Sequence, residues 1–150
     1  MDPASLTFGV VSLAMQLMQT TAAIKKLIAA YKSAAKELSA LSDKLDDVEI
    51  VCSSLEMVLD NFDGAKNSFE IALLNKLHKV ISDCHTKVSK IYELLSKIMH
   101  SQKQSPLRTI GALFLKYREQ INRCIDDLDR SLSSLQLHMT TNILQVSNPT

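Results

Sequence analysis

The sequence predicts an all-α protein, a four-helix bundle with a hydrophobic N-terminal helix. Glycine and proline are scarce, tryptophan is absent, and Ala, Leu, Lys and Ser dominate the 150 residues, which is typical of helical chains. Apolar residues also recur at alternating steps of three and four in four separate segments, the pattern of amphipathic helices. A chain of this length can bury one core without disulfides or metals.

Four apolar stripes define the expected helices. The stripes run over residues 6–31, 38–62, 74–98 and 110–135. Members of the first are Leu6, Val10, Leu13, Leu17, Thr20, Ile24, Leu27 and Tyr31. Because each stripe is narrow and sustained, the helices should pack at shallow angles as a bundle. Cys52, Cys84 and Cys124 fall on the other three stripes, so we expect them buried and unbridged.

Helix boundaries follow from capping and turn residues. Asp2 can cap the first helix, with Pro3 at its first position. A turn near Ser33 should end that helix, because one helix continuing past residue 60 would be exceptional. Residues 61–67 break the second helix, and Pro106 separates the third from the fourth. We expect residues 1–140 to form the bundle and 141–150 to begin a linker.

Charge is unevenly distributed, although the formal net charge is only +1. Residues 36–63 hold eight carboxylates and two lysines, whereas residues 70–103 hold six lysines and three carboxylates. One interpretation is that these two helices are neighbours that attract each other weakly across solvated faces. Alternatively, the lysines meet anionic lipid. The near-neutral total and the lack of interleaved aromatic residues predict no nucleic-acid partner.

No motif in the chain indicates catalysis. P-loop, GxSxG, HExxH and CxxC patterns are all missing from the sequence. His78, Cys84 and His85 have a spacing that matches no established zinc-ligand pattern. We therefore predict no catalytic residue, no metal site and no cofactor, and a protein that is not an enzyme.

The first helix is unusual because no residue between Asp2 and Lys25 carries a charge. At ~1.5 Å per residue, such a helix is long enough to cross a ~30 Å hydrocarbon layer. Scattered serines, threonines and glutamines are atypical of a committed transmembrane helix. The positively charged start of a signal peptide is also missing. The segment is thus suited to being soluble when packed and membrane-active when released.

This helix carries two apolar stripes instead of one. At ~100° per residue, four side chains share one face and four others lie nearly opposite. The two sets are Leu6, Val10, Leu13 and Leu17, and Phe8, Val11, Met15 and Met18. A narrow polar strip, from Ser5 to Gln19, lies between them. The second stripe marks an interface with protein or membrane, unless the helix lies centrally and is covered by the other three.

The opening of the chain resembles a known family. Met1-Asp2-Pro3-Ala4-Ser5-Leu6, followed by Gly9-Val10-Val11-Ser12-Leu13, is similar to the N-terminus of fungal HeLo-like domains. These include the N-terminal domains of many fungal STAND receptors, which carry NACHT or NB-ARC modules. The resemblance extends through the lysine-bearing end of the first helix and the acidic second helix, over residues 1–60.

The resemblance implies a cytoplasmic helical bundle that executes programmed cell death, as in heterokaryon incompatibility and innate immunity. Its N-terminal helix would insert in the plasma membrane after oligomerisation. The implied partners are anionic membrane lipids, further copies of the chain, and a sensor or NACHT/NB-ARC module in the longer protein. The expected insertion or assembly residues are Leu6, Phe8, Val10, Val11, Leu13, Met15, Leu17 and Met18, and the expected headgroup contacts are Lys25, Lys26 and Lys32.

A second hypothesis assigns the chain to another functional class. In this alternative the bundle is a homotypic oligomerisation or adaptor scaffold of a STAND receptor and has no membrane activity. Phe8, Val11 and Met15 would then contact another protomer instead of lipid.

Overall fold

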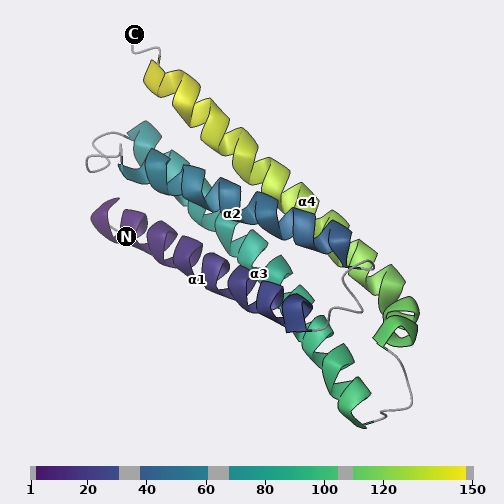
Figure 1. Ribbon diagram of the computed structural model, residues 1–150. Coiled ribbons are helices and arrows are strands. Elements are labelled where there is room, and N and C mark those ends of the chain that lie inside the picture. Colours follow the sequence, from purple (N-terminus) through teal and green to yellow (C-terminus); the bar gives the residue numbers. More distant parts are fainter. Residues whose placement is uncertain (1–2, 31–37, 61–67, 105–109, 148–150) are drawn as a thin grey trace.

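The computed structural model describes residues 3–30, 38–60, 68–104 and 110–147, and these residues form four helices (Figure 1). Helix α1 is Pro3–Ala30, α2 is Ser39–Asp60, α3 is Ser68–Gln104 and α4 is Ile110–Ser147. Within the described ranges there is no strand. The prediction of an all-α four-helix bundle is confirmed.

The helices form a square in which α1 packs against α2 and α3, and α4 packs against the same two helices. Among the described residues, the backbones of α1 and α4 do not approach each other closely, and neither do those of α2 and α3, so these pairs are diagonal. Successive helices run in opposite directions (Figure 1). The expected attraction between a neighbouring acidic α2 and basic α3 is therefore wrong, because the core separates the two helices.

The interior confirms the second and third stripes. All of the described members of these stripes are buried: Leu38, Leu41, Leu45, Val48, Cys52, Leu55, Leu59, Leu74, Leu77, Ile81, Cys84, Val88, Ile91, Leu95 and Ile98. Burying a large aliphatic side chain contributes roughly 1.5–3 kcal/mol, so these two stripes supply much of the stability. Phe62 lies outside the described residues.

The buried stripe of α1 differs in part from the expected one. Ala14, Thr21 and Ile28 are buried, whereas Leu13, Thr20 and Leu27 are only half-buried. The expected stripe followed a seven-residue repeat, but a straight helix with 3.6 residues per turn drifts ~20° per heptad from that repeat. The true stripe is Leu6, Val10, Ala14, Leu17, Thr21, Ile24 and Ile28. Tyr31 lies outside the described residues.

The fourth stripe is less completely buried than expected. Phe114, Ile121, Leu128, Ser131 and Leu135 are buried. Tyr117 and Cys124, by contrast, pack against the core while remaining half-buried. The expectation of three buried cysteines is thus correct for Cys52 and Cys84 and wrong for Cys124, although all three are unbridged.

Each of the three predicted turns falls between two described helices. Helix α1 starts at Pro3 and ends at Ala30, and the expected turn at Ser33 lies outside the described residues, as do Asp2 and Pro106. Helix α4 continues to Ser147, so residues 141–147 are helical where a linker was expected to begin.

Candidate functional site

The candidate site is the outward face of α1, which carries exposed apolar side chains and no charge before Lys25. Phe8 is 75% exposed and Met15 is 54% exposed. Gln16, Gln19 and Ala22 complete this face and are also exposed. A helix of a soluble bundle normally turns charged residues outward, as α3 does with Lys79, Lys90 and Lys97. The outward face of α1 therefore differs from that of α3 in being uncharged and partly apolar.

The structure divides the eight predicted α1 residues into three groups. Leu6, Val10 and Leu17 are buried in the core, as expected. Leu13, Val11 and Met18 are half-buried and pack against the core. Phe8 and Met15 alone among the eight are exposed. Val11 and Met18 lie three and four residues from buried Ala14, on the same side of the helix, which explains why the second stripe divides.

Helix α1 occupies one corner of the square, as each of the other helices does, and is not central. It contacts α2 and α3, and its third side faces outward. The alternative of a helix covered by the other three is thus wrong for the described residues. The segment Ser5–Ala30 is long and apolar enough to cross a membrane, and 28% of its most apolar 18-residue stretch is buried in the bundle. Length and composition alone are weak evidence for membrane insertion, because core helices of soluble proteins share them.

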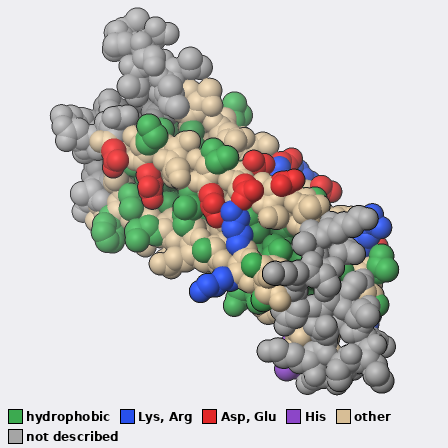
Figure 2. Space-filling view, in the orientation of Figure 1, with side chains coloured by type: hydrophobic (Ala, Val, Ile, Leu, Met, Phe, Trp, Pro, Cys, Tyr) green, Lys and Arg blue, Asp and Glu red, His purple; other side chains and the backbone are tan. Residues whose placement is uncertain are grey.

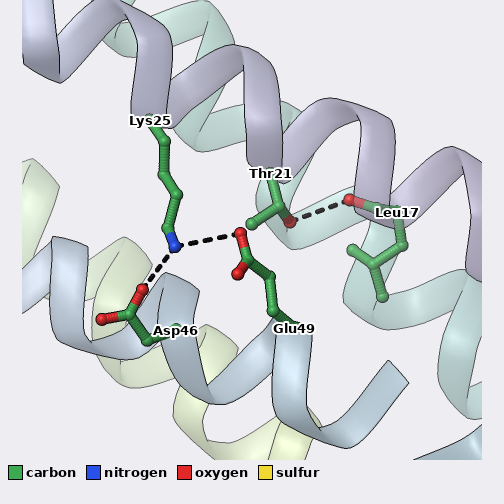
Figure 3. Close-up of polar contacts among 5 residues, drawn as sticks. All are labelled: Leu17, Thr21, Lys25, Asp46 and Glu49. Atoms are coloured by element: carbon green, nitrogen blue, oxygen red, sulfur yellow. Dashed lines mark hydrogen bonds and ion pairs between the residues drawn. The ribbon is translucent and has the colours of Figure 1, made fainter. Parts of the chain in front are cut away.

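The buried hydroxyl of α1 is satisfied within the helix itself. Thr21 is fully buried, and its hydroxyl donates a 2.8 Å hydrogen bond to the Leu17 carbonyl (Figure 3). The Thr20 hydroxyl likewise donates to the Gln16 carbonyl at 3.0 Å. Both hydrogen bonds stay within α1, so neither hydroxyl depends on a polar partner from another helix. These two threonines can therefore enter an apolar environment with their hydroxyls paired.

A surface ion-pair cluster attaches the C-terminal half of α1 to α2. The Lys25 ammonium group pairs with Asp46 and lies 3.0 Å from a Glu49 carboxylate oxygen (Figure 3). Hydrogen bonds to Asp46 and then Glu49 raise the pKa of Lys25 above its usual value. The stabilisation from this raised pKa is complete below the unfolded-state pKa of lysine and is lost as pH rises through the folded-state value. Because the cluster lies at the surface, where water screens the charges, it contributes no more than about 1 kcal/mol.

The three lysines expected to meet headgroups differ in their surroundings. Lys25 is engaged by the two carboxylates of α2, so it is not available to lipid while α1 is packed. Lys26 is exposed at the same end of α1. Lys32 lies outside the described residues. The packed bundle thus leaves Lys26 as the described headgroup candidate.

Sequence reasoning missed a second set of exposed apolar residues, on α2. Ile50 is 64% exposed and Met57 is 71% exposed. Figure 2 shows hydrophobic side chains interspersed with acidic ones on the face formed by α1 and α2. The sequence feature that could have revealed their exposure is their place among the acidic residues of α2, outside its apolar stripe.

No group of three or more His, Cys, Asp or Glu side chains that could hold a metal occurs among the described residues. His78 lies instead beside Gly9 of α1. A side chain added at Gly9 would have its Cβ 3.5 Å from the His78 ring. Cys84 belongs to the core. His78 and Cys84 thus have packing roles in the structure.

The cysteines should differ in reactivity. Burial raises the pKa of Cys52 and Cys84 to about 12, and it also raises the pKa of half-buried Cys124. Since the thiolate is the reactive form, we expect an aromatic disulfide reagent at neutral pH to modify Cys124 first, with the other two protected until unfolding. Mass spectrometry of tryptic peptides identifies the modified residue. Equal labelling rates at Cys52 and Cys124 in the folded protein would contradict the described burial.

Comparisons with known proteins add one result. A family model described as "Pigment biosynthesis cluster protein PigL N-terminal" matches residues 1–150. No curated protein and no solved structure matches the chain significantly. The match supports the broader part of the resemblance, a fungal N-terminal helical domain, and does not identify a HeLo-like domain in particular. The chain belongs to the PigL N-terminal family.

Proposed function

We propose that this chain is a non-enzymatic, membrane-permeabilising effector domain whose α1 leaves the bundle after self-assembly and enters lipid. The observation that supports this most is the state of α1. It lies at the edge of the bundle, exposes Phe8 and Met15, and carries no charge between Pro3 and Ile24. An uncovered apolar surface on a helix of membrane-spanning length suits a segment that packs in the bundle at first and enters lipid later.

Insertion into lipid would offset part of the free-energy cost of releasing α1. Release exposes Leu6, Val10, Leu17, Ile24 and Ile28, each worth roughly 1.5–3 kcal/mol of burial, and hydrocarbon accepts these same side chains. The core faces of α2 and α3 that α1 covers would need to be covered within the assembly. The Lys25 cluster adds only a small barrier. In the inserted helix, Lys25 and Lys26 would remain at the C-terminal end near the headgroups of anionic lipids, with Lys32 further along the chain.

The biological setting follows from the resemblance and remains part of the proposal. The domain would be cytoplasmic, controlled by a sensor or NACHT/NB-ARC module of a longer protein, and recruited to the plasma membrane on activation. Permeabilisation there would cause regulated cell death of the HeLo type. Fractionation of cells before and after forced oligomerisation would test the relocation.

The scaffold alternative has its own supporting observation. Exposed Met57 and Ile50 lie among the carboxylates of α2, including exposed Asp46, Glu56 and Asp60. Carboxylates repel anionic headgroups, so this part of the surface suits a protein partner better than a lipid surface. In that alternative the domain only assembles a receptor, through Phe8, Val11 and Met15.

Dye release from vesicles separates the two functions. We expect the chain to release an encapsulated dye from vesicles of mixed phosphatidylcholine and phosphatidylserine, and to release less from vesicles of phosphatidylcholine alone. The second vesicle type is the matched control, since it removes only the anionic headgroup. A protein that is assembled in solution yet leaves both vesicle types intact is a scaffold, and the membrane proposal would then be abandoned.

A further inference from the structure

Two surfaces of opposite charge lie on opposite sides of the bundle. Helix α2 has six carboxylates and one lysine, and with α1 it forms one side of the square. Helix α3 has six lysines and three carboxylates, and with α4 it forms the other side. Since α2 and α3 are diagonal, these charges do not neutralise each other within one molecule.

The first surface is an apolar ridge bordered by acid, formed by Phe8, Met15 and Met57 with Glu56 and Asp60. The Lys25 cluster fixes the register of antiparallel α1 and α2, because Lys25 is level with Asp46 and Glu49. At the same rise per residue, Met57 is then level with Met15. All five residues are on the half of the bundle that contains the start of α1, and Phe8, Met15 and Met57 are exposed.

The second surface is a groove between α3 and α4 with a volume of about 590 Å³. Lys76, Lys79 and His138 provide its basic side chains, and Val80 provides apolar lining. Asp83 also lines the groove, where its carboxylate accepts a hydrogen bond from the Ser131 hydroxyl. The His138 ring nitrogen Nδ1 lies 2.7 Å from the Ser134 carbonyl.

The ridge and the groove lie at the same position along the long axis of the bundle. The His78 ring, next to groove residues Lys76 and Lys79, lies beside Gly9 of α1. Further along, Thr20 and Ala23 lie beside Ser89 and Tyr92, so α1 and α3 run parallel. The groove residues 76–86 are therefore level with residues 7–17 of α1, which include Phe8 and Met15.

We propose that a second copy of this chain docks its apolar ridge, with Glu56 and Asp60, into the α3–α4 groove rimmed by Lys76 and Lys79. Charge complementarity selects this pairing, because two ridges meeting face to face would bring carboxylates together. The contact is heterologous (head-to-tail), because the ridge of one copy meets the groove of the next. It can therefore repeat from copy to copy and give a ring or a filament. Because ridge and groove are level, parallel copies can dock without an axial shift, and the proposed assembly therefore has its copies side by side with the α1 N-termini at one end.

This inference rests on the assembly step of the proposed function and names the surfaces that would carry it. Copies aligned in this way would present every α1 to the same membrane. The contact itself is tested without lipid, by sedimentation velocity from about 10 µM to 1 mM, a range that includes weak interfaces. Salt near 1 M, where the Debye length is ~3 Å, should reduce the association.

Two charge-reversed variants provide the decisive experiment. Variant A carries Glu56→Lys and Asp60→Lys, and variant B carries Lys76→Glu and Lys79→Glu. All four positions belong to helical segments, and thermal unfolding by circular dichroism verifies that both variants fold. We expect each variant alone to self-associate about tenfold or more weakly than the parent, since attraction becomes like-charge repulsion.

Mixing the two variants should restore assembly. The unchanged groove of A accepts the unchanged ridge of B, and the reversed ridge of A meets the reversed groove of B. Matched controls on the same helices, at their opposite ends, are Asp43→Lys and Lys97→Glu, which should assemble like the parent. A parent that stays monomeric, variants that assemble normally, or a mixture that stays monomeric would each overturn the proposal.

Vesicle leakage measured on the same samples separates this inference from the proposed function. If the mixture assembles but neither it nor the parent releases dye, the contact is correct and the membrane function is wrong. If the parent releases dye but the mixture does not assemble, the head-to-tail contact is wrong and the membrane function stands.

Discussion

Replacing Met15 by glutamate is expected to abolish dye release from anionic vesicles while leaving the fold intact. Met15 lies near the middle of α1 and is more than half exposed, so a carboxylate there is solvated in the bundle. At the centre of a membrane-embedded helix, an acidic residue costs roughly 2.5–3.5 kcal/mol on insertion scales. That cost reduces the inserted population more than tenfold, because about 1.4 kcal/mol corresponds to a factor of ten.

The control for this variant is Leu115→Glu on α4. Leu115 is 67% exposed, so the substitution has the same chemistry on a helix that is not proposed to insert. We expect this variant to release dye like the parent. Because Met15 also belongs to the apolar ridge, sedimentation of Met15→Glu is measured on the same samples, so that a loss of dye release caused by weaker assembly is recognised as such. A folded, assembled Met15→Glu protein that still releases dye would show that α1 does not insert.

The second large effect is on stability, at Leu17. This side chain is fully buried on α1, and truncation to alanine should lower the free energy of unfolding by about 2–5 kcal/mol. Met15→Ala, two residues away on the exposed face, should change it by no more than about 0.5 kcal/mol. Urea titration followed by circular dichroism measures both values. Equal effects at the two positions would contradict the described orientation of α1.

Leu17 is a better choice for this measurement than Leu13, which the apolar pattern favours equally. Leu13 is only half-buried, so part of its side chain already faces water. Its truncation should therefore have a smaller effect than truncation of Leu17. Comparing the two leucines tests the register of α1 in the bundle with no change in residue type.

The two proposed roles of α1, assembly and insertion, are compatible because the ridge is built from two helices. Phe8 and Met15 lie on α1, whereas the bordering carboxylates Glu56 and Asp60 belong to α2. Release of α1 would leave the carboxylates behind on the bundle and carry the apolar side chains into lipid. The same residues can thus serve protein contact first and membrane contact later, as the two proposals require.

The sequence by itself determined the helical class and the buried faces of α2 and α3. Each of these helices has one continuous stripe of large apolar residues, and only burial of that stripe is energetically acceptable. For α2 and α3, periodicity therefore identified the described core positions directly. The N-terminal helix was recognised as exceptional for a related reason, since its two apolar stripes cannot both face one core.

Only the tertiary structure decided which part of each stripe is covered. Periodicity states which residues share a helix face, but the neighbouring helices determine which of those residues lose contact with water. Thus Val11 and Met18 pack inward while Phe8 and Met15 do not, and Cys124 is half-buried although it lies on the fourth stripe. The diagonal placement of α2 and α3 likewise depends on how four helices fill a square, a choice that no single helix encodes.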